Sequence, residues 1–219
     1  YTVTARATDD MAATTTSAAI TVTVGPAPPP GGAIDEVVLY AGIDAQVGGG
    51  WSAVPDATAA GEVRLQNPDA GQPKVPAPLA SPAQYFDVTF DAEAGRPYHL
   101  WLRGVALKDN YNNDSVFVQF DNSVDISGNP VWRIGTTSAT TVILEDCSGC
   151  GVKGWGWNDN GYGLNVFGPD VYFASSGPQR IRVQAREDGL GVDQVVLSAV
   201  AYRNASPGTT KNDSVIVPR

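Results

Sequence analysis

Histidine, cysteine and methionine are almost absent from this sequence. It has one histidine, His99, two cysteines and one methionine in 219 residues. A Ser-His-Asp triad needs a positioned histidine, and zinc sites usually need several histidines or cysteines. With so few of these residues, we expect neither a catalytic triad nor a zinc site rich in histidine. His99 follows Tyr98 inside a predicted strand, where we expect a packed or surface histidine and not a general base. We therefore expect a protein that is not an enzyme.

Long apolar runs and an excess of positive charge are also missing. No run approaches the roughly 20 apolar residues that a membrane-spanning helix requires, so we expect no membrane insertion. The sequence has 14 Lys and Arg against 23 Asp and Glu, which gives a net charge of −9. An acidic surface repels phosphate backbones, so we expect no nucleic-acid partner. The same acidity suits a protein that binds Ca²⁺ through carboxylates.

Glycine, proline and short apolar alternations are abundant instead. Gly (24) and Pro (16) accompany 42% hydrophobic and 17% charged residues, a composition typical of short strands joined by turns. Apolar residues alternate with polar ones at Phe86–Phe90 and Ile181–Ala185, and Val116, Val118 and Phe120 alternate with Phe117 and Gln119, which predicts short strands. We expect one all-β, antiparallel sandwich over residues 34–203, with no helix longer than two turns. We expect the polar tail, residues 204–219, to lie along this domain or to add a short strand at 214–217.

The first 24 residues predict a separate β-hairpin. Tyr1, Val3, Ile20 and Val22 alternate with polar residues, and Asp9-Asp10 supplies the turn. The pattern resembles the last two strands of bacterial immunoglobulin-like domains. A lone hairpin is marginally stable in water, so we expect this remnant to pack on the next domain or on another copy of the chain. Residues 25–33 are rich in proline and glycine and predict a semi-rigid linker. Because Tyr1 begins in mid-strand, we expect the sequence to be a piece of a longer protein.

The two cysteines form the segment Cys147-Ser-Gly-Cys150. Such a pair is compatible with a redox centre, with half of a zinc site or with a small disulfide. A zinc site needs about four ligands and a second pair is missing, and a redox pair normally opens a helix after a strand. We favour a structural disulfide over free thiols or a functional pair.

Two polar segments rich in aromatic residues are the candidate ligand-binding residues. Gly154–Gly163 places two tryptophans and a tyrosine among glycines and short amides, which predicts a loop. Aromatic rings stack on the C–H faces of sugars, and Asn and Asp pair with sugar hydroxyls; the alternative is that a tryptophan closes one end of the sandwich. Lys108–Ser115 is the second segment, and its alternative role is a plain turn. The candidates are Trp155, Trp157, Asn158, Asp159, Asn160 and Tyr162 in the first segment, and Tyr111, Asn112, Asn113 and Asp114 in the second.

Three longer motifs give a family resemblance. They are Gly95-Arg-Pro-Tyr-His-Leu-Trp-Leu-Arg-Gly104, Asn113-Asp-Ser-Val-Phe-Val-Gln119 and Arg186-Glu-Asp-Gly-Leu-Gly-Val-Asp-Gln-Val-Val-Leu197. Over residues 35–202 the sequence resembles bacterial carbohydrate-binding modules of families six and thirty-five. The resemblance implies a galactose-binding-like jelly roll with a sugar site on loops at one edge of the sandwich.

The resemblance also implies a structural Ca²⁺ held partly by an aspartate of the final strand, which matches Asp193. The other usual ligands form a Glu-Ala-Glu pattern in the first strand, and this pattern is broken here by Leu39-Tyr40-Ala41. Asp35 and Glu36 are the expected substitutes, with Asp44 or Glu62 as alternatives. Asp193 is alternatively an ordinary carboxylate at a strand edge.

The sequence therefore predicts a non-catalytic module that targets a secreted multidomain protein to polysaccharide. The alternative is a structural or adhesive surface module that assembles through its N-terminal strands. Trp155 and Trp157 open to solvent would favour sugar binding, whereas burial of these rings under the tail would favour the alternative. An enzyme would need a pocket with paired carboxylates, for which the sequence offers Glu145, Asp146, Glu187 and Asp188.

Overall fold

The computed structural model describes residues 2–21, 33–145, 147, 149–163 and 166–219. The chain divides into two units, Tyr1–Ala33 and Ile34–Arg219. Within the described residues, no helix combines the length and the apolar character that crossing a membrane requires.

The N-terminal unit is the predicted hairpin. Strand β1 (Thr2–Val3) pairs with β4 (Ile20–Thr21), and β2 (Arg6–Thr8) pairs with β3 (Thr14–Thr16). The Asp9 carboxylate accepts the backbone N–H groups of Met11 and Ala13 at 3.0 and 2.8 Å, which fixes the turn where the sequence predicts it. Residues 4–19 are all exposed. Val22 and Val24 lie outside the described residues, and the immunoglobulin-like origin of the hairpin stays a prediction.

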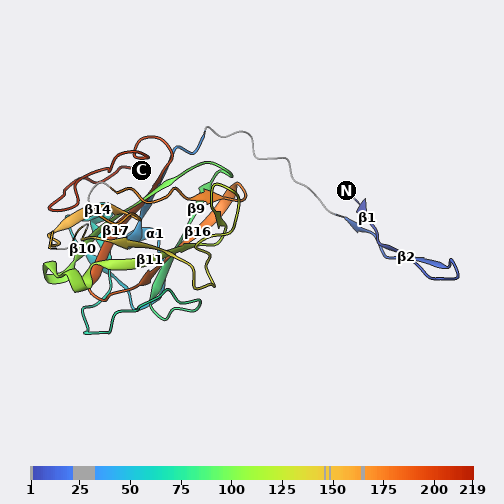
Figure 1. Ribbon diagram of the computed structural model, residues 1–219, viewed down its shortest axis with the longest axis horizontal. Helices are drawn as coiled ribbons and strands as arrows, with labels where there is room; N and C mark the ends of the chain where they lie inside the picture. Colours follow the sequence, from blue (N-terminus) through green and yellow to red (C-terminus); the bar gives the residue numbers. More distant parts are fainter. Residues whose placement is uncertain (1, 22–32, 146, 148, 164–165) are drawn as a thin grey trace. The chain divides into compact units, whose positions relative to one another are not determined.

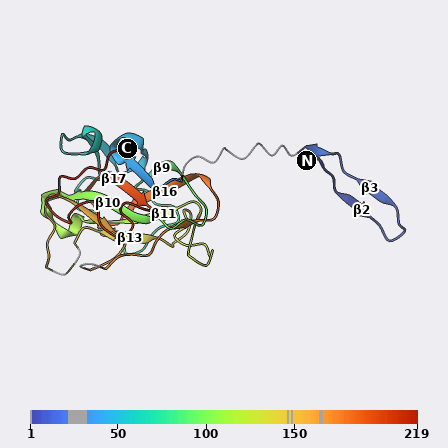
Figure 2. The same ribbon diagram turned by 90° about the horizontal axis from the view of Figure 1, so that it is seen from above.

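The second unit is a sandwich of two antiparallel sheets (Figures 1 and 2), which confirms the predicted all-β fold. One sheet contains, in order, β14 (Trp155–Asp159), β10 (His99–Ala106), β17 (Leu190–Ser198), β8 (Val63–Gln66) and β7 (Ser52–Pro55), with β5 (Glu36–Tyr40) also paired to β17. The other sheet contains β13 (Thr140–Ile143), β11 (Ser115–Phe120), β16 (Gly177–Ala185), β9 (Tyr85–Ala92) and β6 (Gln46–Gly49). A small ribbon joins β12 (Ser123–Val124) to β15 (Tyr172–Phe173). The described helices are short: α1 (Ala41–Asp44) and the 3₁₀ turns η1 (Ala60–Glu62), η2 (Leu107–Asp109) and η3 (Tyr111–Asn113).

The core between the sheets follows from the predicted alternation. In β9, Phe86, Val88 and Phe90 face inward and are buried, and Val88 pairs with Ile181 of β16, which also faces the core. Phe90 meets Phe173 edge to face at 5.6 Å between ring centroids. Period-two alternation buries one face of each strand, so the local pattern is enough to fix which side chains enter the core.

The prediction that Gly154–Gly163 is a loop is wrong for its first half. Residues Trp155 to Asp159 form β14, which pairs with β10 along its whole length, from Val105 opposite Trp155 to Trp101 opposite Asp159. The hydrogen bonds of the neighbouring strand override the weak strand propensity of glycine. Gly156 has a packing role, because a Cβ atom there would lie 1.9 Å from the carbonyl oxygen of Thr210.

That carbonyl belongs to the C-terminal tail, residues 204–219, which crosses the outer face of the six-stranded sheet. The N–H of Trp157 donates to Thr209 O at 2.9 Å, and the N–H of Asp213 donates to Trp155 O at 2.8 Å. The Gln194 side chain donates to Val217 O at 2.8 Å and accepts the N–H of Val217 at 3.0 Å. The tail lies along the domain, as one of the two predictions has it, and the alternative strand at 214–217 is not formed.

Candidate functional site

The two predicted tryptophans are covered by the tail. Trp157 is fully buried, and its indole N–H donates to Val215 O at 3.0 Å. Trp155 is 8% exposed, donates to Thr58 Oγ1 at 2.9 Å, and stacks against the Arg103 guanidinium at 4.6 Å from its ring centroid. The expected open platform is therefore absent from β14, and this burial is the arrangement that favours a structural module.

Most of the predicted amides also bond within the fold. Asn158 donates to Leu144 O at 2.8 Å, Asn160 to Pro169 O at 3.1 Å and Asn113 to Leu107 O at 3.2 Å. Asn158 and Asn113 are buried, while Asn160 is half-buried. Each of these hydrogen bonds uses the side-chain NH₂ group to reach a backbone carbonyl, so the three side chains hold loops and strands together.

Asp159 lies beside the single histidine. His99 is buried, with Nε2 at 2.8 Å from an Asp159 carboxylate oxygen and Nδ1 at 3.5 Å from Asp170 Oδ1. Burial disfavours the charged form of Asp159, but the hydrogen bonds from His99, Gly161 and Gly168 outweigh it and lower the pKa of this carboxyl. The expectation of a packed histidine is confirmed.

The remaining predicted residues come together in one hollow of about 360 Å³. Tyr111 and Asn112 line it from one predicted segment, and Tyr162 lines it from the other, with Asp114 beside them. Each tyrosine is 61% exposed. The remaining lining residues are Lys74, Ile143, Glu145, Arg186 and Glu187. We call this site the tyrosine hollow.

Local turns and strand ends position these side chains. Tyr111 and Asn112 lie on η3, where the Asn110 side chain accepts the N–H of Asn112 at 3.0 Å and caps the turn. Asp114 follows at the start of β11; its carbonyl accepts the N–H of Leu144 at 2.9 Å, and its carboxyl accepts the N–H of Glu145 at 3.2 Å. The beginning of β11 is thereby tied to the end of β13.

Two buried carboxyls form the polar floor of the tyrosine hollow. Burial, and next the neighbouring Glu187, raise the pKa of Asp114 to about 8. Burial also opposes ionisation of Glu187, but hydrogen bonds from Asp114, Lys74 and Ser115 lower its pKa, and Lys74 Nζ lies 2.5 Å from its Oε1. The two pKa shifts have opposite signs, because adjacent negative charges repel and ionisation is favoured at only one of the two carboxyls.

The sequence does not single out Lys74, Ile143 or Arg186 as site residues. Arg186 and Glu187 open the last family motif, which is the signal that could have drawn attention to this turn. Lys74 carries no local signal, since it lies in the connection between β8 and β9 and reaches the hollow only through the tertiary fold.

The cysteines confirm the predicted pairing. Cys147 and Cys150 form a disulfide between β13 and β14, next to Glu145, which accepts the N–H of Gly151 at 3.3 Å. The carbonyl of Cys150 accepts a hydrogen bond from Lys211 of the tail. The disulfide therefore lies between a wall of the tyrosine hollow and the tail.

The residues expected to bind calcium do not converge. Asp193 is fully buried, pairs with Arg103 and accepts the N–H of Ala60 at 2.7 Å. Asp35 pairs with Arg96. Glu36 accepts the backbone N–H groups of Val200 and Ala201 at 3.3 and 2.6 Å.

The alternative ligands lie apart as well, since Asp44 accepts the N–H of Tyr40 at 2.8 Å and pairs with Arg219, and Glu62 is exposed. Among the residues that the structure describes, no three His, Cys, Asp or Glu side chains gather as a metal site. The donor set implied by the resemblance does not fit Ca²⁺ at Asp193, because an arginine side chain already lies against its carboxylate.

Comparisons with known proteins give remote structural likenesses. No family model and no curated protein match the sequence. The Podospora anserina GH26-CBM35 β-(1,4)-mannanase is 10% identical with a TM-score of 0.47, and the alignment covers 77% of this chain but only 28% of the mannanase. The C-terminal CBM6 of LamC, a marine laminarinase from Zobellia galactanivorans, is 7% identical over 74% of this chain and 98% of its own, with a TM-score of 0.44. The carbohydrate-binding module CBM36 in complex with calcium and xylotriose is 14% identical over 73% and 97%, with a TM-score of 0.40. The chain is thus similar, at low identity, to carbohydrate-binding modules of families 6, 35 and 36.

Proposed function

We propose that residues 34–219 form a non-catalytic carbohydrate-binding module and that the tyrosine hollow receives the sugar. The observation that carries this proposal is the presence of two largely exposed tyrosines, Tyr111 and Tyr162, in one hollow with amide and charged side chains. Exposed aromatic side chains gathered in a hollow are typical of ligand sites. Their faces suit the C–H faces of a pyranose ring.

The polar lining supplies both kinds of hydrogen-bonding group that sugar hydroxyls need. Asn112 offers a donor and an acceptor, Glu145 and Glu187 accept, and Lys74 and Arg186 donate. The lining combines two cations, Lys74 and Arg186, with two acidic side chains, Glu145 and Glu187, and the ligand we propose is a neutral or acidic glycan. A few stacked rings with these hydrogen bonds supply about 4–8 kcal/mol, which corresponds to a Kd between about 1 mM and 1 μM.

The module is proposed to act outside the cell, within a secreted multidomain protein. The disulfide supports this location, because disulfides persist mainly in oxidising compartments. The segment 25–33, rich in proline, would separate the module from preceding domains. Tethering to polysaccharide would then raise the local concentration of the partner domain on the glycan.

Binding without catalysis is proposed because of the relation between the carboxyls. Asp114 and Glu187 are immediate neighbours, and each shifts the pKa of the other. Glycosidases instead hold two carboxyls about 5–9.5 Å apart, on opposite sides of the bond that breaks.

A structural or adhesive surface module is the second candidate. It is favoured by the burial of Trp155 and Trp157 beneath the tail and by the N-terminal hairpin, whose residues 4–19 are exposed. Sedimentation of the full chain over a wide concentration range tests it. Stable self-association without any glycan affinity would favour this candidate, whereas a monomer that binds glycan would favour the first.

The glycan-binding proposal is tested by a glycan array followed by calorimetry on the best ligand. Tyr111→Ala and Tyr162→Ala should each weaken binding about tenfold or more, which corresponds to about 1.4 kcal/mol per factor of ten. Tyr111→Phe keeps the stacking face and is the matched control, and Ile126→Ala removes an exposed apolar side chain outside the hollow. If the folded alanine variants of both tyrosines bind as the parent does, the site lies elsewhere.

A further inference from the structure

Asp193 occupies a β-bulge in the middle of the six-stranded sheet. The register between β10 and β17 shifts there, because Arg103 pairs with Gln194 while Gly104 pairs with Val192, which leaves Asp193 as the extra residue. Asp193 is 0% exposed; one carboxylate oxygen accepts the N–H of Ala60, and the other, Oδ1, has no hydrogen-bond partner among the described residues. A buried carboxylate of this kind requires a nearby cation.

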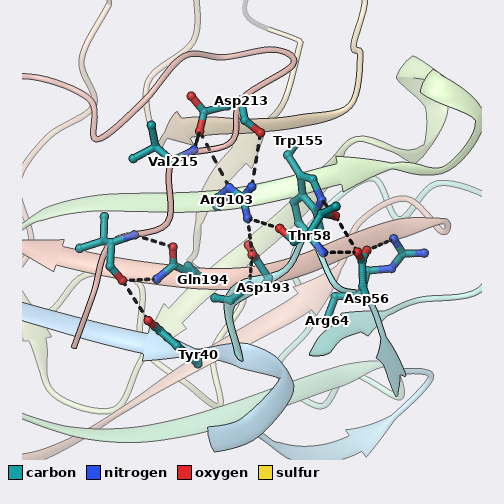
Figure 3. Close-up of polar contacts among 12 residues, drawn as sticks. Tyr40, Asp56, Thr58, Arg64, Arg103, Trp155, Asp193, Gln194, Asp213 and Val215 are labelled. Carbon is teal, nitrogen blue, oxygen red and sulfur yellow. Dashed lines mark hydrogen bonds and ion pairs between the residues drawn. The ribbon is translucent and has the colours of Figure 1, made fainter. Parts of the chain in front are cut away.

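The cation is the guanidinium of Arg103, which is also fully buried. Figure 3 shows its polar contacts. It pairs with Asp193 Oδ2, and Nη2 donates to Asp213 O at 3.3 Å. Nη1 lies 3.5 Å from Thr58 O, and Nε lies 4.0 Å from Asp213 Oδ1. Its remaining side faces the Trp155 ring. Oxygen atoms from β17, from the loop before η1 and from the C-terminal tail therefore surround one positive charge.

We propose that Arg103 is the internal cation of this domain and that it occupies a shell of oxygen atoms that would otherwise suit a divalent metal ion. Two carboxylates and two carbonyl groups are the donors that hard cations such as Ca²⁺ prefer. The guanidinium already neutralises these donors, and a second cation beside it would be repelled. The domain is therefore stable without calcium.

Burial raises the pKa of Asp193 to about 6, although Arg103 and the N–H of Ala60 act in the opposite direction. The other carboxylates that the family resemblance implies as ligands, Asp35 and Glu36, are engaged elsewhere with Arg96 and with the backbone of residues 200 and 201. Nothing in this cluster except Arg103 supplies positive charge within the distances given above.

Removal of the guanidinium should turn the oxygen shell into a metal site. In Arg103→Ala, the Asp193 and Asp213 carboxylates and the carbonyls of Thr58 and Asp213 would surround a space without a cation. Arg103→Ala should then bind Ca²⁺, whereas the parent chain should not respond to it. Arg103→Lys keeps a positive charge in the shell and should also remain unresponsive.

Thermal unfolding of the full chain, in EDTA and in CaCl₂, tests the proposal. The Tm of the parent should agree in the two buffers within about 1 °C. Arg103→Ala should have a lower Tm in EDTA and regain about 5–11 °C at a Ca²⁺ concentration a hundredfold above its Kd. The double variant R103A/D193N should lose this gain, because it lacks one of the two carboxylates.

Two results would overturn the proposal. One is a Tm of the parent that rises by several degrees in Ca²⁺, with the rise absent from Asp193→Asn. The other is a folded Arg103→Ala whose Tm ignores Ca²⁺. If Arg103→Ala is unfolded in both buffers, Arg103→Lys and elemental analysis of the parent decide: a calcium response of the lysine variant, or bound calcium in the parent, contradicts the proposal, and their absence supports it.

Discussion

Strand β14 and the tyrosine hollow contain similar residues, but the aromatic rings are buried in the first and exposed in the second. Both have aromatic rings next to asparagine and aspartate, and they are joined through the segment from Trp155 to Tyr162. On β14 the rings are buried because the tail passes over them, whereas Tyr111 and Tyr162 lie where no described segment covers them. The exposure of these aromatic rings therefore depends on a segment that lies 58 residues away at Val215, and not on their sequence neighbours.

The buried aspartates of the two regions differ in the same way. Asp193 lies against an arginine, and its pKa is about 6, whereas Asp114 lies against a glutamate, and its pKa is about 8. Burial raises both values, and the sign of the neighbouring charge separates them. At Asp193 the fold supplies an opposite charge, whereas at Asp114 it places a second acidic group that disfavours ionisation.

The largest expected contrast is between Trp157→Ala and Tyr162→Ala. Trp157→Ala removes a fully buried ring and should lower the free energy of unfolding by about 3–5 kcal/mol. Tyr162→Ala removes an exposed ring and should change it by less than about 0.5 kcal/mol. Urea denaturation of both variants measures the difference. Equal losses in the free energy of unfolding would mean that the tail does not bury Trp157 more than Tyr162.

Gly156→Val tests the same comparison by displacing the tail from β14. The new side chain would meet the Thr210 carbonyl, so we expect a loss of about 1–3 kcal/mol and faster proteolysis within residues 204–219. Limited proteolysis with mass spectrometry locates the cuts. Thr141→Val, on the edge strand β13, is the control for adding a β-branched apolar residue. A tail equally protected in both variants would contradict the close crossing at Gly156.

The disulfide connects the two regions, and its loss should have a smaller effect. The closed loop is short, so reduction should cost about 2 kcal/mol, the low end of the range for disulfides. Denaturation with and without reductant measures this cost, and intact mass after alkylation reports the thiols. The variant C147S/C150S should ignore reductant. Two thiols that alkylate in the native, unreduced protein would show that the bond is absent.

The last contrast concerns pH and Asp114, where the lowered pKa of the neighbouring Glu187 acts in the opposite direction and reduces the net effect. Its pKa rises from 3.8 to about 8 on folding, so its stabilising contribution is complete below about pH 4 and is lost as the pH rises towards 8. Asp114→Asn should remove this part of the pH dependence. The difference in Tm between parent and variant, measured from pH 3 to 9, should drift in favour of the variant as the pH rises. Parallel curves would mean that Asp114 titrates normally.

The fold could be predicted from the sequence because one face of each main strand is buried. Phe86, Val88 and Phe90 alternate with polar residues, and this local pattern alone places them in the core. The disulfide was also predictable, since the only two cysteines are three residues apart. These features depend on neighbours in the sequence.

The covering of β14 could not be predicted in this way. The glycines around Trp155 and Trp157 are typical of loops, and nothing local shows that β10 and the tail enclose them. Calcium at Asp193 was expected from the family resemblance, and nothing local showed that Arg103, 90 residues away in the sequence, is its partner. A signal did exist: Arg103 lies in the apolar run His99–Ala106, where a charged residue needs a buried partner.

The tail also has a consequence for the order in which the domain folds. Trp101 bonds to Tyr202 and Arg103 to Asp213, pairs that are 101 and 110 residues apart. Contacts of such separation form slowly, because long loops must close first. During synthesis from the N-terminus, the outer face with Trp101 and Trp157 stays uncovered until the end of the tail has emerged. During this interval the nascent domain exposes this aromatic face to aggregation or to chaperones.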